Sequence, residues 1–208
     1  MIKEFFGLFY LFLRVDLIES FKKRNIRIIY LFYITFFALI SSKISMEKKE
    51  ALLKNLREII TEYIKNKEYI ELIDCRDFEV SNLSSLKEIY ETLNMFSVAM
   101  NIFLKKNENT LFKQSLIESY NAFSHILNGI KSSDTSFNKN VRKAYNHFYR
   151  GALDYYKTII RKEFEKIDKE KLKELRFEEF SSIGIEASNN KIKKEIIDKY
   201  KKLVTEIK

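Results

Sequence analysis

The sequence contains no proline and no tryptophan, and only four of its 208 residues are glycine. Average usage of about 5% proline would give roughly ten prolines in a chain of this length. Because proline interrupts helix interiors, its absence leaves long segments free to form helices. Lys and Glu are abundant, and 18 Phe and 12 Tyr can fill thick contacts between helices. We therefore predict an all-α fold, a helical bundle with a sizeable core.

Cysteine and histidine are scarce as well. The single Cys75 cannot form an intramolecular disulfide, which favours a reducing compartment for the polar part of the chain. One cysteine and two distant histidines fall short of the ligand set of an ordinary zinc site. The sequence also lacks a phosphate-binding glycine loop, a dinucleotide fingerprint and a nucleophile motif. It therefore points to no metal and no cofactor.

Negative charge is in short supply, since 38 Lys and Arg outnumber 29 Asp and Glu and give a formal net charge of +9. Such a charge fits nucleic acid, anionic lipid or solubility alone. Part of the excess lies in lysine-rich runs such as residues 191–202, and a compositional bias towards Lys, Ile, Asn, Phe and Tyr would produce it without any functional demand. Charge by itself does not choose a partner.

Long uncharged runs occur only near the N-terminus. Phe5 to Leu13 would cover about 14 Å as a helix, too little for a hydrocarbon core of roughly 30 Å, so we expect an interfacial helix there. Residues 26–44 approach the length of about 20 that a span needs if Arg27 and Lys43 snorkel at its ends. The predicted membrane segment contains Ile28, Tyr30, Phe32, Phe36, Phe37 and Leu39.

This pattern divides the chain into an N-terminal membrane segment, residues 1–45, and a helical domain, residues 46–208. Lysine and arginine are balanced before and after the apolar segment, so the positive-inside rule assigns no orientation. A domain that meets RNA must face the cytoplasm, which implies the inner membrane. The alternative is that residues 26–44 form a helix buried in a bundle or in an oligomer.

Apolar periodicity predicts the remaining helices. They cover residues 46–66, 84–106, 109–131, 138–167, 169–180 and 191–208, with a loop at 67–82 and a turn region at 181–190. The capping residues Ser136, Asn138 and Asn140 suggest that the longest helix starts near residue 138. Spacings of 4, 3, 4, 3 and 4 align one apolar stripe of this helix, formed by Val141, Tyr145, Phe148, Ala152, Tyr155 and Ile159.

Arg142 and His147 flank this stripe and are the candidate site. A histidine can move the 2′-hydroxyl proton of RNA, and an arginine can balance the charge of the attacked phosphate, so cleavage would need no metal. Five residues at about 100° each place the two side chains about 140° apart on one helix, so a composite site would need two protomers. The alternative is that Arg142 is a solvated residue and that His147 bonds to Asp154 or to a neighbouring helix.

The spacing Arg142-x4-His147 on a late helix resembles the signature of the HEPN superfamily, small helical bundles that carry an Arg-x4-6-His motif. Together with the apolar N-terminus, the chain resembles the small accessory membrane proteins of type VI-B CRISPR-Cas loci. The resemblance implies an antiviral protein that supports an RNA-guided RNA nuclease, forms a homo-oligomer in the membrane and compromises its barrier. It also implies membrane lipid, RNA or the effector nuclease as partners.

Two other functions remain open from the sequence. One is a membrane-tethered, metal-independent HEPN ribonuclease of a toxin or abortive-infection system, and the other is a structural helical membrane protein. Because Arg142 and His147 lie beside the apolar stripe, we expect their replacement by alanine to cost no more than about 1 kcal/mol of stability.

Overall fold

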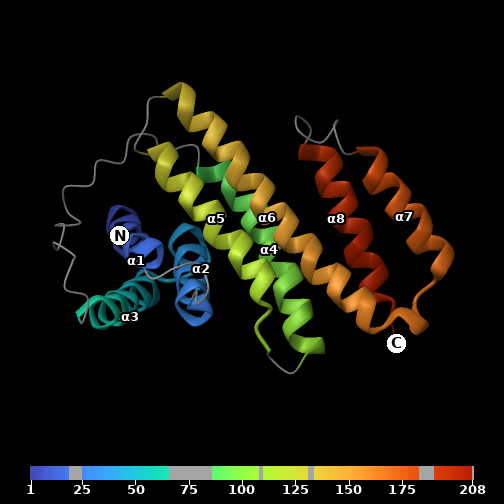
Figure 1. Cartoon of the computed structure of the whole chain (residues 1–208), viewed down its shortest axis with the longest axis horizontal. Helices are drawn as coiled ribbons and strands as arrows, with labels where there is room; N and C mark the ends of the chain where they lie inside the picture. Colours follow the sequence, from blue (N-terminus) through green and yellow to red (C-terminus); the bar gives the residue numbers. More distant parts are fainter. Residues whose placement is uncertain (19–24, 66–85, 108–109, 131–133, 183–189, 208) are drawn as a thin grey trace.

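The computed structural model describes residues 1–18, 25–65, 86–107, 110–130, 134–182 and 190–207 (Figure 1). Within these residues the chain forms a bundle of eight α-helices and no strand, which confirms the all-α prediction. The predicted loop at 67–82 and the turn region around Gly184 lie outside the described residues. The helices are α1 (Ile2–Ile18), α2 (Ile26–Ile40), α3 (Met46–Lys65), α4 (Leu86–Lys106), α5 (Lys113–Ile130), α6 (Asp134–Lys162), α7 (Lys169–Ser182) and α8 (Asn190–Thr205), with the short 3-10 helix η4 (Phe164–Lys166).

Helix α6 lies at the centre of the bundle. Figure 1 shows α1 to α3 at one end of the molecule, the long helices α4 to α6 in the middle, and α7 and α8 at the other end. The most extensive contact in the described chain joins α5 to α6, and the next joins α4 to α6. All six residues of the predicted stripe on α6 are buried, which confirms the stripe. Phe96 of α4 packs its ring against Phe148 and Tyr155 at centroid distances of 5.8 and 5.4 Å.

The start of α6 corrects the sequence prediction. The helix begins at Asp134, so Ser136 and Asn138 lie inside it rather than in a capping loop. Phe137 is 2% exposed, and this burial of an aromatic side chain outweighs the preference of Ser, Thr and Asn for caps. As a result Arg142 lies in the third turn of the helix, whereas a start near residue 138 would place it in the second.

The end of α6 is followed by a short connection to α7. The carboxylate of Asp168 accepts hydrogen bonds from the backbone N–H groups of Glu170 and Lys171, both at 3.1 Å, and so caps α7. Glu179 then ties α7 to its neighbours, because it accepts from Tyr200 Oη of α8 at 2.6 Å and pairs with Lys157 of α6.

Helices α1 and α2 are packed into the bundle through aromatic side chains. Phe5 and Phe9 of α1 and Phe36 of α2 contact Phe123 of α5 at ring distances of 5.8, 5.5 and 5.2 Å. The N-terminal residues thus share one hydrophobic core with α5.

The predicted membrane segment corresponds to α2, which ends at Ile40 after 15 residues. That length is about 22 Å, shorter than the stretch of 26–44 that the sequence suggested. Among the described residues no helix combines the length and the apolar character that crossing a bilayer requires. Of the six predicted residues, Tyr30 and Phe37 are partly buried, and the fully buried ones are Ile28, Phe32, Phe36 and Leu39.

Candidate functional site between helices α5 and α6

Two glycines let α5 and α6 approach closely. A Cβ at Gly151 of α6 would lie 2.5 Å from Cε2 of Phe96 and 3.2 Å from Cβ of Glu118, so only glycine fits without displacement. On α5, a Cβ at Gly129 would lie 3.2 Å from both Phe137 and Asn140. The approach at Gly151 brings the backbone of α5 at Glu118 next to α6, one turn beyond His147.

His147 is paired with a carboxylate of the neighbouring helix. Its Nδ1 lies 2.7 Å from Oε2 of Glu118, and the two side chains are only 15% and 13% exposed. A carboxylate only accepts hydrogen bonds, so Nδ1 of His147 carries the proton that it donates to Glu118. With the proton at Nδ1, the ring nitrogen that can carry a lone pair is Nε2. This is the arrangement by which a carboxylate fixes the tautomer of a histidine that acts as a base.

Arg150 completes the group. It is 55% exposed, its Nε lies 3.5 Å from Oε2 of Glu118, and its Nη2 lies 2.9 Å from Nδ1 and 3.5 Å from Nε2 of His147. Nδ1 cannot accept from Arg150 while it donates to Glu118. We assign the hydrogen bond to the shorter contact, because it joins the ring N–H to a charged acceptor. Arg150 is therefore a cation held beside the ring by Glu118.

The second histidine lies against the first. The rings of His125 on α5 and His147 on α6 are stacked with centroids 5.1 Å apart and planes 20° from parallel. His125 Nδ1 lies 3.4 Å from Oδ1 of Asn140. Burial lowers the pKa of His125, the hydrogen bond that the ring donates to Oδ1 of Asn140 opposes this, and the nearby charges of His147, Lys143 and Arg150 lower the pKa further. His125 is thereby favoured in its neutral form.

The acidic residue Asp154 lies near the same group. Burial raises the pKa of its carboxyl, the proximity of Glu118 raises the pKa further, and Lys157, Arg161 and Arg150 lower it in part. No contact joins Asp154 to His147 among those seen in the described chain. The partner of His147 is Glu118 of α5. Of the two partners that the sequence left open for this histidine, Asp154 or a neighbouring helix, the structure shows the neighbouring helix.

The two residues of the Arg-x4-His motif have different surroundings. His147 is largely buried against α5, whereas Arg142 is exposed and forms no hydrogen bond or ion pair with any described side chain. Within one protomer the arginine that contacts His147 is Arg150, three residues after it. A composite site of Arg142 and His147 across two protomers stays a prediction.

Sequence reasoning missed Glu118 and Arg150. The spacing of three residues from His147 to Arg150 places them on one helix face and was a signal within α6. Glu118 had a weaker signal: it is seven residues, or two turns, before His125 on α5, so the carboxylate and the histidine share a face. What the sequence does not contain is the register of α5 against α6, which brings Glu118 and His147 together.

The side chains that meet between α5 and α6 have the chemical groups that acid–base chemistry uses. Among the described residues, no three His, Cys, Asp or Glu side chains are placed to hold a metal ion. Cys75 lies outside the described part of the chain. The arrangement provides a histidine lone pair, a carboxylate that orients the ring and a partly exposed cation.

Comparison of the chain with protein families, with curated protein sequences and with solved structures gives no match.

Proposed function

We propose that the chain is a HEPN-like helical protein that cleaves RNA without a metal, at a site formed by Glu118, His147 and Arg150. The observation that carries the proposal is the 2.7 Å contact of His147 Nδ1 with the Glu118 carboxylate, beside the guanidinium of Arg150. The resemblance of the Arg142-x4-His147 spacing to the HEPN signature supports RNA as the substrate. The local geometry supports His147 as the group that moves the proton.

In the proposed reaction Nε2 of His147 takes the proton of a ribose 2′-hydroxyl. The 2′-oxygen forms a bond to the adjacent phosphorus, and the bond from phosphorus to the 5′-oxygen breaks. The departing 5′-oxygen takes a proton from water, and the hydroxide that remains takes the proton held by His147. The products are a 2′,3′-cyclic phosphate and a 5′-hydroxyl. Glu118 stabilises the imidazolium that forms, and Arg150 balances the charge that develops on the phosphate oxygens.

The membrane functions inferred from the sequence stay predictions. They are an antiviral accessory protein that compromises the membrane and a structural membrane protein. For α1 and α2 to enter a bilayer, Phe5, Phe9 and Phe36 would have to leave their packing against Phe123 of α5. This cost makes the acid–base function the better supported proposal. Self-association, lipid binding, the inner-membrane location and a CRISPR effector as partner stay predictions too.

The test is incubation of the purified full-length chain with a labelled single-stranded RNA in the presence of EDTA. We expect fragments that end in a 2′,3′-cyclic phosphate, and no cleavage of the same oligonucleotide with 2′-O-methyl riboses. The His147→Ala and Glu118→Gln variants should cleave at least about 100-fold more slowly, the range seen when one group of an acid–base site is removed.

Two results would contradict the proposal. One is intact RNA with the wild-type chain, and the other is cleavage that His147→Ala leaves unchanged, which would reveal a contaminating nuclease. Far-ultraviolet circular dichroism and a thermal melt of each variant separate a loss of chemistry from a loss of fold.

A further inference from the structure

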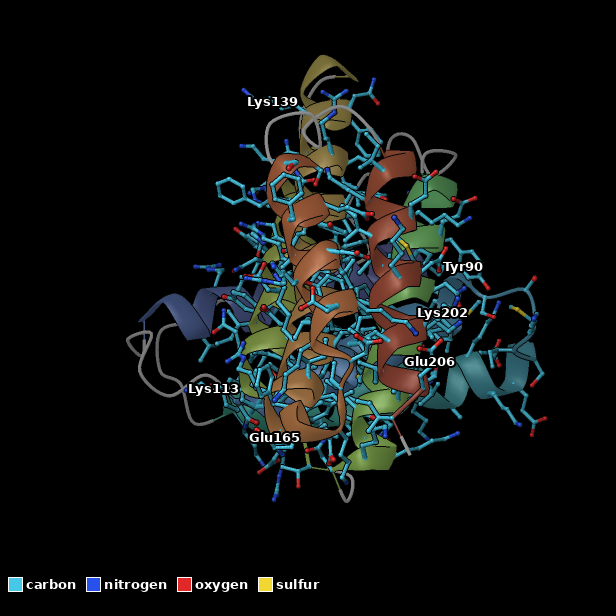
Figure 2. The ribbon with its side chains drawn as sticks, turned by 90° about the vertical axis from the view of Figure 1, so that its right-hand side faces the viewer. Tyr90, Lys113, Lys139, Glu165, Lys202 and Glu206 are labelled. Atoms are coloured by element: carbon cyan, nitrogen blue, oxygen red, sulfur yellow. The ribbon has the colours of Figure 1, made fainter. Side chains whose placement is uncertain are left out.

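Four exposed cations of α6 lie along one line of the helix, here called the cation stripe: Lys139, Lys143, Arg150 and Arg161. They are separated by 4, 7 and 11 residues, which correspond to one, two and three helical turns, so they stay within about 40° of one another over about 33 Å. Lys143 and His147 are one turn apart, so the stripe passes beside the histidine. Figure 2 labels Lys139, the first residue of the stripe, near the top, and Glu165, in the 3-10 helix that follows α6, near the bottom.

Within the described chain, Lys143 and Arg161 of the cation stripe form no hydrogen bond or ion pair, whereas Arg150 lies 3.5 Å from the carboxylate of Glu118. Lys157, on the same side of the helix, is paired with Glu179 of α7. Helix α6 contains seven Lys and Arg against two Asp. Asp154 lies near the stripe: burial and the proximity of Glu118 raise the pKa of its carboxyl, and the stripe residues Arg150 and Arg161, with Lys157, lower it in part.

Arg142 lies off this path. It is three residues after Lys139 and one before Lys143, so its side chain leaves the helix about 60° from the first and about 100° from the second. The stripe thus includes Arg150 and passes beside His147, but it does not include Arg142, the arginine of the sequence motif.

We propose that the cation stripe binds the phosphate backbone of single-stranded RNA and leads it past His147. This inference rests on the proposed function and names the form of its substrate. The four cations follow one line of the helix, which matches the path of one strand. The attack of a 2′-oxygen needs a backbone that can turn until the 2′-oxygen lies opposite the 5′-oxygen. A base-paired A-form strand holds its backbone in a fixed geometry, whereas a single strand can turn.

The experiment measures binding of a 20-nucleotide labelled RNA by fluorescence anisotropy between 50 and 200 mM salt. All proteins carry His147→Ala, so that no RNA is cleaved during the titration. Each neutralised phosphate contributes about −0.7 to the slope of log K against log salt. Lys143→Gln with Arg161→Gln should therefore reduce the slope by about 1.4 and weaken binding at least about tenfold at 50 mM salt.

The matched control carries Lys194→Gln with Lys201→Gln, two exposed lysines of α8, and loses the same net charge. We expect it to change the slope by less than half as much. Equal losses in the stripe pair and the control pair would overturn the inference, as would equally tight binding of a duplex of the same length. A third result would also overturn it: the chain does not bind RNA, but it binds anionic phosphatidylserine vesicles, and the loss of Lys143 and Arg161 abolishes that binding.

Failure of this inference can be told from failure of the proposed function. If the stripe pair abolishes RNA binding while the wild-type chain cleaves no RNA, the cation stripe stands and the acid–base function fails. If the wild-type chain cleaves RNA and the stripe pair binds it normally, the cation stripe alone is wrong.

Discussion

Helix α5 has two unlike faces. One face carries Tyr120 and Phe123, whose rings pack against the aromatic side chains of α1 and α2. The other carries Glu118 and His125, which meet the polar side of α6. The aromatic face gains its stability from buried apolar area. The polar face encloses a carboxylate and two imidazoles, whose burial stabilises little and restricts what the groups can bind. We therefore expect substitutions on the first face to unfold the chain and substitutions on the second to change its chemistry.

The largest effect is expected at the aromatic face. Phe123→Ala removes a fully buried ring that contacts α1, α2 and α6, and should lower the free energy of unfolding by about 3 to 5 kcal/mol. Phe177→Ala, on α7, is the control, since that ring is 71% exposed and its loss should change the stability by less than about 0.5 kcal/mol. Urea denaturation measures both. Similar losses in the two variants would show that the aromatic cluster does not hold α1 and α2.

The close approach of α5 and α6 provides a second test. Gly151→Ala forces a Cβ against the buried Phe96, and we expect it to cost about 1 to 3 kcal/mol despite the better helix propensity of alanine. It should also slow RNA cleavage, because the displaced atoms include Cβ of Glu118. Gly129→Ala meets its neighbours at 3.2 Å and should be tolerated better in a thermal melt. Equal melting temperatures of Gly151→Ala and the wild type would contradict the packing.

Substitutions of His147 and Arg142 should lower the stability less than those above, and by different amounts. His147→Ala leaves the mostly buried Glu118 without its hydrogen-bond donor, so we expect a loss of about 1 kcal/mol or slightly more. Arg142→Ala, fully on the surface, should change stability by less than about 0.5 kcal/mol. The sequence-based expectation of equally small costs is thus revised for the histidine. Matching unfolding curves for the two variants would show that the contact with Glu118 adds nothing.

The smallest effect is a dependence of stability on pH. The pKa of His125 is lower in the fold than its ordinary value of 6.5, so the unfolded chain binds the proton first as the pH falls. Stability should therefore decrease as the pH falls below about 6.5, and above that range His125 should contribute no dependence. Asp154, whose pKa is raised from 3.8 in the fold, contributes the opposite dependence, because its carboxyl binds a proton more readily in the folded chain than in the unfolded chain. In His125→Gln the denaturation midpoint should change less between pH 7 and 5.5 than in the wild type. The same change with pH in both proteins would exclude His125 as the cause.

The sequence predicted the elements better than their arrangement. The apolar stripe of α6 follows from its spacing, because a stripe of that period has to be buried. The start of α6 did not follow, since Phe137 packs on Gly129 and extends the helix through residues that prefer caps. The sequence of α2 resembles that of a membrane span because a helix buried in a bundle and a helix in lipid both carry apolar side chains.

Of the candidate site, the sequence indicated Arg142 and His147, and the arginine that contacts His147 within the folded chain is Arg150. The motif spacing singled out Arg142, which points away from the histidine on a regular helix. The contact with Glu118 depends on the register of two helices, and no local pattern within either helix encodes that register.

The central claim is that the arginine beside His147 in the folded protomer, Arg150, serves the chemistry. Single-turnover cleavage of single-stranded RNA in EDTA by the wild type, Arg150→Ala and Arg142→Ala tests it most directly. We predict that Arg150→Ala slows cleavage by about 100-fold or more, the loss expected when one charge-stabilising group is removed, while Arg142→Ala stays within a few-fold of the wild type. Full activity of Arg150→Ala together with loss of activity in Arg142→Ala would contradict the account.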